Sequence, residues 1–185
     1  MSSNRIFYRT RQFWQALGPA PVHEDMQLVQ SILTSKQQEL FDRLQPGEKT
    51  HSFRVLRALL EQDEKNPDLL IAALLHDVGK SRFPLRLWER VLIVLVKSIA
   101  PSWVQRLGYL NSTGSQRHSL GWRRPFIISE QHPHWGAEMA AETGVNPLVI
   151  SLIRRHQEIL DNSLGASFSL EEHLLRKLQA VDDHY

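Results

Sequence analysis

An apolar segment of the chain ends in Leu74-Leu75-His76-Asp77-Val78-Gly79-Lys80. The seven residues before His76, 69–75, are all apolar, which is typical of a helix buried on every side. Adjacent His76 and Asp77 at the end of such a helix can present two ligands to neighbouring positions. We expect Gly79 to permit a sharp exit from the helix, and Lys80 to place a cation where a phosphate group can bind.

Helical spacing of apolar residues recurs along the chain on both sides of this segment, whereas the alternation typical of strands is scarce. Proline and glycine separate the periodic segments, as at Asn66-Pro67 and at Gly144. Ser169 and Glu172 form a predicted capping box for the last helix. We therefore predict an all-α fold with helices at 10–17, 24–33, 35–44, 47–63, 67–77, 85–99, 101–109, 132–143, 146–157 and 170–184.

The length and composition are those of one ordinary globular domain. Of 185 residues, 42% are hydrophobic and 23% charged, which makes wholesale disorder implausible. We expect one domain over 1–185, with short N-terminal helices within 1–45 and a basic, amphipathic subregion at 81–130. Loops are predicted at 111–122 and 161–167, where polar and small residues gather.

Two absences narrow the function classes. The chain has no cysteine, which excludes disulfides, thiolate zinc sites and a cysteine nucleophile. Its N-terminus is polar, and its uninterrupted apolar runs, 69–75 and Val91–Val96, fall far short of the ~20 residues that a spanning helix needs. We expect a cytoplasmic protein.

Four predicted helices each carry an ionisable residue in line with their apolar residues, namely His51, His76, His156 and Asp182. A lone histidine of this kind is usually hydrogen-bonded in a core, and an aspartate near a helix end can be a cap or half of an ion pair. Four such residues on four helices favour a shared divalent cation, because imidazole and carboxylate groups together bind Mn, Fe, Ni or Zn. Alignment with the apolar residues favours Asp182 over Asp183.

The chain resembles the HD superfamily of metal-dependent phosphohydrolases. The resemblance covers roughly residues 47–80 and 130–185. It rests on His51-Ser52-Phe53-Arg54-Val55, on residues 75–80 and on Gln179-Ala180-Val181-Asp182. Two further segments are similar to the two-metal members, notably the HD-GYP branch: His132-Pro133-His134-Trp135-Gly136-Ala137 and Ile153-Arg154-Arg155-His156-Gln157-Glu158.

This resemblance implies an HD-domain-like bundle of helices around a buried metal site, and hydrolysis of a phosphoester or phosphoanhydride. The first divalent ion would have as its ligands His51, His76, Asp77 and Asp182. Asp77 would bridge to a second ion bound by His132 and His156. The cofactor is expected to be one or two ions of Mn, Fe, Ni, Zn or Mg.

The chain departs from the HD-GYP branch at two points. That branch has two consecutive histidines where this chain has His156-Gln157, and its Gly-Tyr-Pro motif is absent here. These departures argue against cyclic di-GMP as the substrate and predict a weaker second site. We expect His132 to begin a helix with Pro133 in its first turn, and Gly136 to let a neighbouring backbone or ligand approach closely.

The expected chemistry assigns catalysis to Asp77 and Lys80, with metal-activated water as the nucleophile and Lys80 offsetting phosphoryl charge. Arg54, Arg154 and Arg155 are further candidates for binding substrate phosphate, although surface arginines are common. The substrate is expected to be a small, nucleotide-like anion, with no stable nucleic acid partner. Two alternatives remain open: a di-iron oxygenase on the same scaffold, and a non-catalytic module that binds a nucleotide or lipid.

Basic residues are concentrated in one segment of the chain. Residues 80–130 hold nine basic and two acidic residues, a charge of +7, although the whole chain carries only +2. This asymmetry suggests an anionic partner, or simply a solvated basic face. Within the segment, 85–107 has a wide apolar face that could lie in a membrane interface, or could equally be a core helix or the contact of a homodimer.

Overall fold

The computed structural model describes residues 23–108, 121–160 and 169–184, and every regular element within these ranges is helical. The all-α prediction is therefore confirmed. The predicted helix at 10–17, the predicted loop at 161–167 and most of the one at 111–122 lie outside the described residues. The α-helices are α2 (His23–Ile32), α3 (Ser35–Asp42), α4 (Pro46–Glu61), α5 (Pro67–Leu75), α6 (Leu87–Ile99), α7 (Pro101–Gly108), α8 (Arg124–Ala141), α9 (Pro147–Arg155) and α10 (Leu170–Asp182). Two short 3₁₀ helices, η1 (Val78–Arg82) and η2 (Gly121–Arg123), precede α6 and α8.

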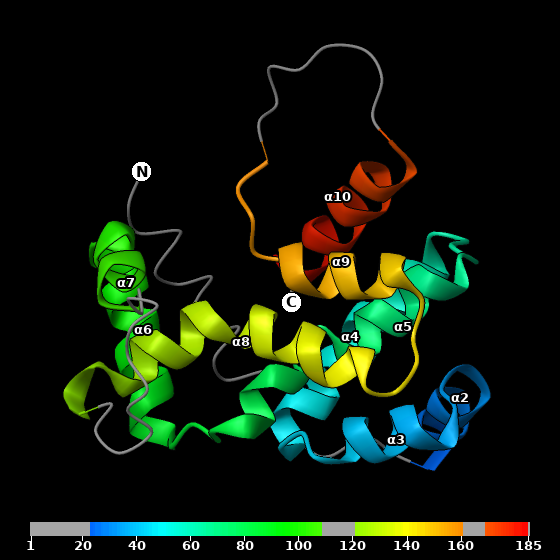
Figure 1. The fold of residues 1–185 in the computed structure, drawn as a ribbon, viewed down its shortest axis with the longest axis horizontal. Helices are drawn as coiled ribbons and strands as arrows, with labels where there is room; N and C mark the ends of the chain where they lie inside the picture. The colour runs from blue at the N-terminus through cyan, green and yellow to red at the C-terminus, as the bar shows by residue number, and fades with distance from the viewer. Residues whose placement is uncertain (1–22, 109–120, 161–168, 185) are drawn as a thin grey trace.

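The core is built around α5, which is apolar from Leu69 to Leu75 and buried there except at the half-buried Ile71. Its fully buried residues are Leu69, Ala72, Ala73, Leu74 and Leu75. The helices α4 and α9 pack against α5, and α10 contacts all three (Figure 1). Asn66 starts α5 by accepting a hydrogen bond from the Leu69 N–H at 3.1 Å, with Pro67 in the first turn. The helix thus delivers its last residues into the interior of the bundle.

The chain leaves α5 at Leu75, two residues earlier than predicted, and His76 and Asp77 form the joint to η1. The reason expected for Gly79 is wrong, because Gly79 lies inside η1 and does not adopt a left-handed conformation. Close packing explains this glycine instead. A Cβ at Gly79 would lie 2.0 Å from the carbonyl oxygen of His132 and 2.6 Å from the backbone nitrogen of Gly136.

Gly136 provides the other half of this close approach. A Cβ there would lie 3.1 Å from the Gly79 nitrogen, so two glycines let η1 and α8 touch backbone to backbone. The prediction that Gly136 permits such an approach is confirmed, and the neighbour is the η1 backbone. As a consequence Asp77, just before η1, lies next to His132 on α8.

The prediction that His132 begins a helix is wrong. The helix α8 starts eight residues earlier, at Arg124, and carries Pro133 in its interior. An internal proline leaves one carbonyl without its N–H donor, here that of Ser129, four residues back. The Nδ1 atom of His132 lies 2.9 Å from that carbonyl oxygen and replaces the missing donor. The helix therefore continues through Pro133.

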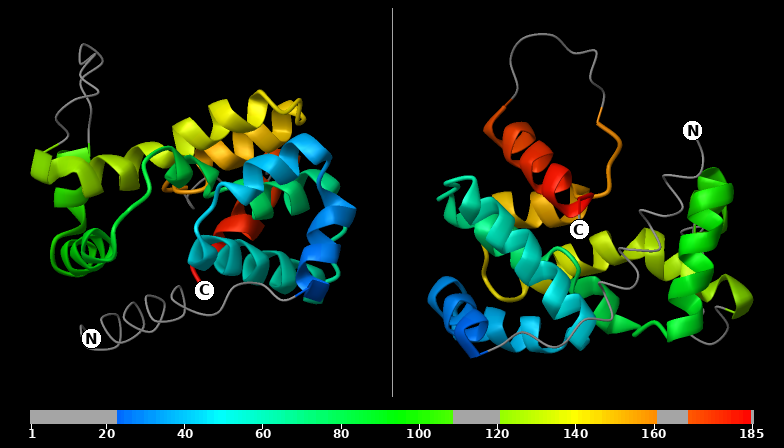
Figure 2. Two further views of the ribbon diagram at one scale, coloured as in Figure 1. Left: turned by 90° about the horizontal axis from the view of Figure 1, so that it is seen from below. Right: turned by 180° about the vertical axis from the view of Figure 1, so that it is seen from behind.

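The long helix α8 connects two parts of the molecule. Its first half packs against α6 and α7, and its second half against η1 and α9. Figure 2 shows α6 and α7 at one end of the molecule and α2 and α3 at the other. Two ion pairs with buried glutamates attach α6 to the rest: Glu89 with Arg124 of α8, and Arg90 with Glu48 of α4 at 2.6 Å. Within the described residues, no helix is long and apolar enough to cross a membrane.

The contact between Gly79 and Gly136 predicts that alanine lowers the stability by different amounts at the two positions. Gly79→Ala should lower the free energy of unfolding by about 3 kcal/mol, because its methyl group meets backbone atoms that cannot rotate away. Gly136→Ala should cost clearly less, since its nearest contact is 3.1 Å and alanine is the better helix former. Urea denaturation of both variants measures the difference, and equal stabilities would contradict the proposed packing.

Candidate metal centre

Five elements bring six ionisable side chains to one place in the bundle. His51 comes from α4, His76 and Asp77 follow α5, His132 belongs to α8, His156 follows α9, and Asp182 ends α10. Two sets of three could each hold a metal ion: His51, His76 and Asp77, and Asp77, His132 and His156. In each set the ligand atoms lie within 4.8 Å of one another. Asp77 belongs to both sets.

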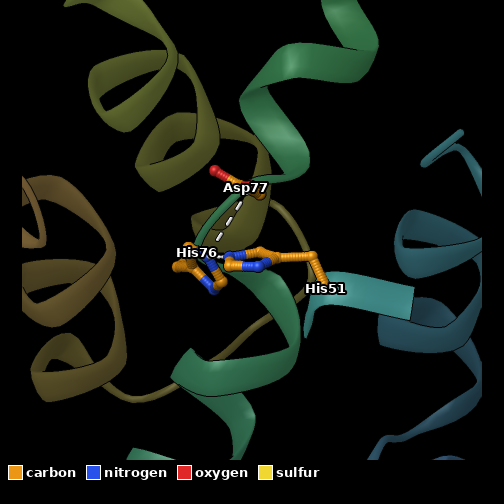
Figure 3. Close-up of side chains that lie close together, drawn as sticks. All are labelled: His51, His76 and Asp77. Carbon is orange, nitrogen blue, oxygen red and sulfur yellow. Dashed lines mark hydrogen bonds and ion pairs between the residues drawn. The ribbon is translucent and has the colours of Figure 1, made fainter. Parts of the chain in front are cut away.

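The first set closes around His76 (Figure 3). The Nε2 atoms of His51 and His76 are 3.3 Å apart, and Asp77 Oδ2 lies 3.7 Å from His76 Nε2. Asp182 completes this group: its Oδ1 lies 2.7 Å from His51 Nε2 and 3.3 Å from His76 Nε2. Its neighbour Asp183 is exposed. All four residues assigned to the first ion therefore converge.

The second set lies on the other side of Asp77. The Nε2 atoms of His132 and His156 are 3.3 Å apart. Asp77 Oδ1 lies 3.2 Å from the first of these atoms and 4.0 Å from the second. The carboxylate thus turns Oδ1 toward this pair and Oδ2 toward the His76 side, which is the arrangement that a bridging ligand requires.

Helix carbonyls orient three of the four histidines in the same way. Nδ1 of His76 lies 2.9 Å from the Ala73 carbonyl oxygen, and Nδ1 of His156 lies 2.7 Å from that of Ile153. Because a carbonyl only accepts, each Nδ1 must carry the hydrogen, which leaves Nε2 to face the cluster. Both histidines stand directly after a helix, where carbonyls lack helical N–H donors.

His132 has the same orientation, with the hydrogen on Nδ1 and Nε2 facing the cluster, although it lies inside a helix. There every carbonyl normally has an N–H donor, but Pro133 removes the donor to Ser129. Nδ1 of His132 donates to that carbonyl oxygen at 2.9 Å, and the carbonyl is again three residues back in the chain. Sequence reasoning missed this role of Pro133, although the signal was visible as a proline directly after a ligand histidine.

The charges in the cluster are strongly coupled. Burial opposes the charged form of Asp77, yet Lys80 and His76 hold the pKa of this carboxyl well below its usual range. Burial likewise opposes ionisation of Asp182, but His76 and His51 hold the pKa of Asp182 well below its usual range. Burial would keep His76 neutral, but the carboxylates of Asp77 and Asp182 raise its pKa to about 9. Both aspartates therefore stay ionised and attract a cation.

The pKa values of His132 and His156 are shifted in the direction opposite to that of His76. Burial lowers the pKa of His132, and burial together with His76 and His132 lowers the pKa of His156 to about 3. Two neutral imidazoles then face each other, with their Nε2 atoms 3.3 Å apart and the lone pairs of these atoms directed at each other. Facing lone pairs repel, and a metal ion between them would turn this repulsion into two bonds. This donor set fits a divalent ion.

The two positions differ in their access to solvent. The His51 and Asp182 side chains are 20% and 18% exposed, whereas those of His132 and His156 are at most 1% exposed. The first position therefore opens toward solvent, and the second is enclosed. Of the other histidines, His134, His173 and His184 are exposed, and His118 lies outside the described residues.

The candidate phosphate-binding residues have different surroundings. Lys80 Nζ lies 2.6 Å from Asp77 Oδ2, so it stands at the edge of the cluster. Arg54 is half-buried on α4, three residues after His51, and Arg154 is exposed. Arg155 binds Glu158 at 2.6 Å and Glu171 at 2.5 Å, so its guanidinium already has two carboxylate partners.

A family model for the HD domain matches residues 49–101. The similarity to HD domains is thus shown for this segment of the chain. The match includes His51, His76 and Asp77, whereas His132, His156 and Asp182 lie beyond it. HD domains are generally metal-dependent hydrolases that bind divalent ions, in agreement with the His/Asp groups. Comparison with curated proteins and with solved structures found no match. The similarity to the HD-GYP branch stays a prediction.

Removal of the shared carboxylate should empty both positions. We expect Asp77→Ala to lose all bound transition metal, because Asp77 is the only residue common to both ligand sets. His132→Gln should lose the second ion only. Elemental analysis of purified protein measures both, with His134→Gln, an exposed histidine two residues away, as the control. A wild-type metal content in Asp77→Ala would refute the assignment.

Pro133→Ala should separate stability from metal binding. The new N–H can bond to the Ser129 carbonyl, so the metal-free protein should gain stability, by up to about 3 kcal/mol. The same bond competes with His132 Nδ1, so affinity for the second ion should fall by about tenfold. Thermal unfolding and metal titration measure the two effects. Unchanged affinity would show that the freed carbonyl does not orient His132.

Proposed function

We propose that this protein is a metal-dependent phosphohydrolase acting on a small anionic phosphate substrate of the nucleotide type. The observation that carries the proposal is the position of Asp77, whose two oxygens face two different groups of imidazoles. The match of residues 49–101 to the HD domain supports the reaction class. One or two divalent ions bound there would lower the pKa of a water molecule and polarise phosphoryl oxygens.

The protein's own residues would position the reactants. Lys80 is bound to Asp77 and its side chain is 24% exposed, so its ammonium group can reach a substrate without leaving the cluster. A phosphoryl group at the cluster would then compete with Asp77 for Lys80, and Lys80 would offset the charge that develops on the phosphoryl oxygens. We therefore assign Lys80 to substrate phosphate and Asp77 to the metal ions.

The substrate would approach from the solvent-accessible side. His51, Asp182 and Lys80 are the members of the cluster with exposed atoms, and they lie on α4, on α10 and in η1. Arg54 is three residues from His51 on α4 and so lies on the same face of the helix. It is our second choice for a phosphate contact, and Arg154 is the third. Arg155 is the least suitable of the predicted arginines because Glu158 and Glu171 already bind it.

Lys80→Ala should lower the turnover number by about a hundredfold on a nucleotide or other phosphoester substrate, because one charge at the phosphoryl group is lost. The metal content should stay unchanged, since Lys80 supplies no metal ligand. Lys49→Ala removes another ion-paired lysine, bound to Asp42, and is the matched control. Loss of metal together with activity in Lys80→Ala would contradict the substrate role.

A screen of nucleotides and phosphoesters with added divalent ions tests the proposal itself. Release of phosphate or cleavage of a diester, abolished by Asp77→Ala, is the expected result. Oxygen-dependent absorbance from bound iron without any hydrolysis would favour the di-iron oxygenase. Nucleotide binding without turnover, in protein with a full metal content, would favour the non-catalytic module.

A further inference from the structure

The helix α6 carries apolar residues on two opposite sides. On one side Ile93 is buried beside α7 and α8, in line with buried Glu89 and with buried Leu85, which lies two residues before the helix. The residues offset from these by two positions point the other way, because two residues turn a helix by about 200°. These outward residues, also spaced by four, are Leu87, Val91, Leu95 and Ile99.

The outward side of α6 has no cover among the described residues. Its four aliphatic residues are 37% to 81% exposed, and Trp88 beside them is 55% exposed. On the next helix, α7, which packs against α6, Trp103 is 62% exposed. On the inward side, Leu85 and Ile93 form a hydrophobic cluster with Ile128 of α8. Packing within the described part of the chain therefore does not explain the outward side.

The exposed charge of the segment that carries this surface is of one sign. Arg86 and Arg106 are exposed, at the start of α6 and near the end of α7. The only carboxylates in residues 80–108 and 121–130 are Glu89 and Glu130. Glu89 is buried against Arg124, and Glu130 is half-buried, where burial raises its pKa. The acidic residues of the segment thus contribute little negative charge at the surface.

We propose that the outward face of α6, with Trp103 of α7, docks onto the surface of an anionic lipid membrane. An exposed apolar stripe with tryptophan and flanking arginine is what an interfacial helix uses, burying its apolar residues among acyl chains while cations meet lipid phosphates. A second copy of the chain fits less well, because a two-fold contact brings the same cations together. A nucleic acid would complement the arginines but not the aliphatic stripe.

Flotation of the full chain with lipid vesicles tests this docking. The protein should float with phosphatidylcholine vesicles that contain phosphatidylglycerol, and far less with pure phosphatidylcholine. Leu95→Glu or Ile99→Glu should lower the vesicle partition coefficient by about tenfold or more, through lost apolar burial and added repulsion. Ile159→Glu is the matched control, since Ile159 is 84% exposed and lies outside this surface.

Charge-reversal variants test the electrostatic contribution to membrane docking. Arg86→Glu with Arg106→Glu should lower partition by about tenfold or more, whereas Lys36→Glu, an exposed lysine on α3, should leave it unchanged. Absence of flotation, or binding that survives all α6 and arginine variants, overturns the proposal. So does a dimer in light scattering that Ile99→Glu converts to monomers without any vesicle binding, and so does retention by duplex DNA in place of vesicles.

Discussion

Burial of the Asp77 carboxylate is the constraint on which the rest of the structure depends. An ionised carboxylate in a protein interior costs several kcal/mol unless partners surround it. Here Lys80 and His76 approach Oδ2, and a divalent ion between Oδ1 and His132 of α8 would balance the charge on the other side. These partners come from different elements, so α5, η1 and α8 must meet in one relative position. A divalent ion at the same place would strengthen this requirement, because each ligand would be held by a bond in addition to packing.

The packing around the cluster holds α5, η1 and α8 in this relative position. The apolar α5 places His76 and Asp77 in the interior, and the Gly79–Gly136 contact brings α8 within reach of Asp77. Carbonyls at the ends of α5 and α9, and the one that Pro133 frees in α8, point the histidines inward. Backbone groups thus determine the direction of three ligands, and side-chain packing determines their distance. The more exposed position near Asp182 gives a substrate access, whereas the pair of His132 and His156 stays enclosed.

The outward surface of α6 and the metal centre are connected through the same helix, α8. The helix α8 packs against α6 and α7 and carries His132 at its middle. The ion pairs Glu89–Arg124 and Arg90–Glu48 hold α6 against this framework. A membrane surface bound by α6 would therefore be at a fixed distance from the metal centre, and the protein would act on substrate close to that surface.

The sequence by itself determined the helical fold, the buried α5 and the identity of the ligand candidates. The helices follow from local patterns, namely apolar spacing and a Ser169–Glu172 capping box that the structure confirms. The ligand candidates follow from ionisable residues in apolar stripes together with the resemblance to HD proteins, which alone supplied His132. Only the tertiary structure decided that Asp77 faces two groups, that Gly79 is needed for contact with α8, and that Pro133 lies inside a helix. It also decided that α6 exposes one of its apolar sides. The physical reason is the same in each case: the neighbour that explains the residue is distant in the chain, or is a backbone carbonyl that no side-chain pattern reveals.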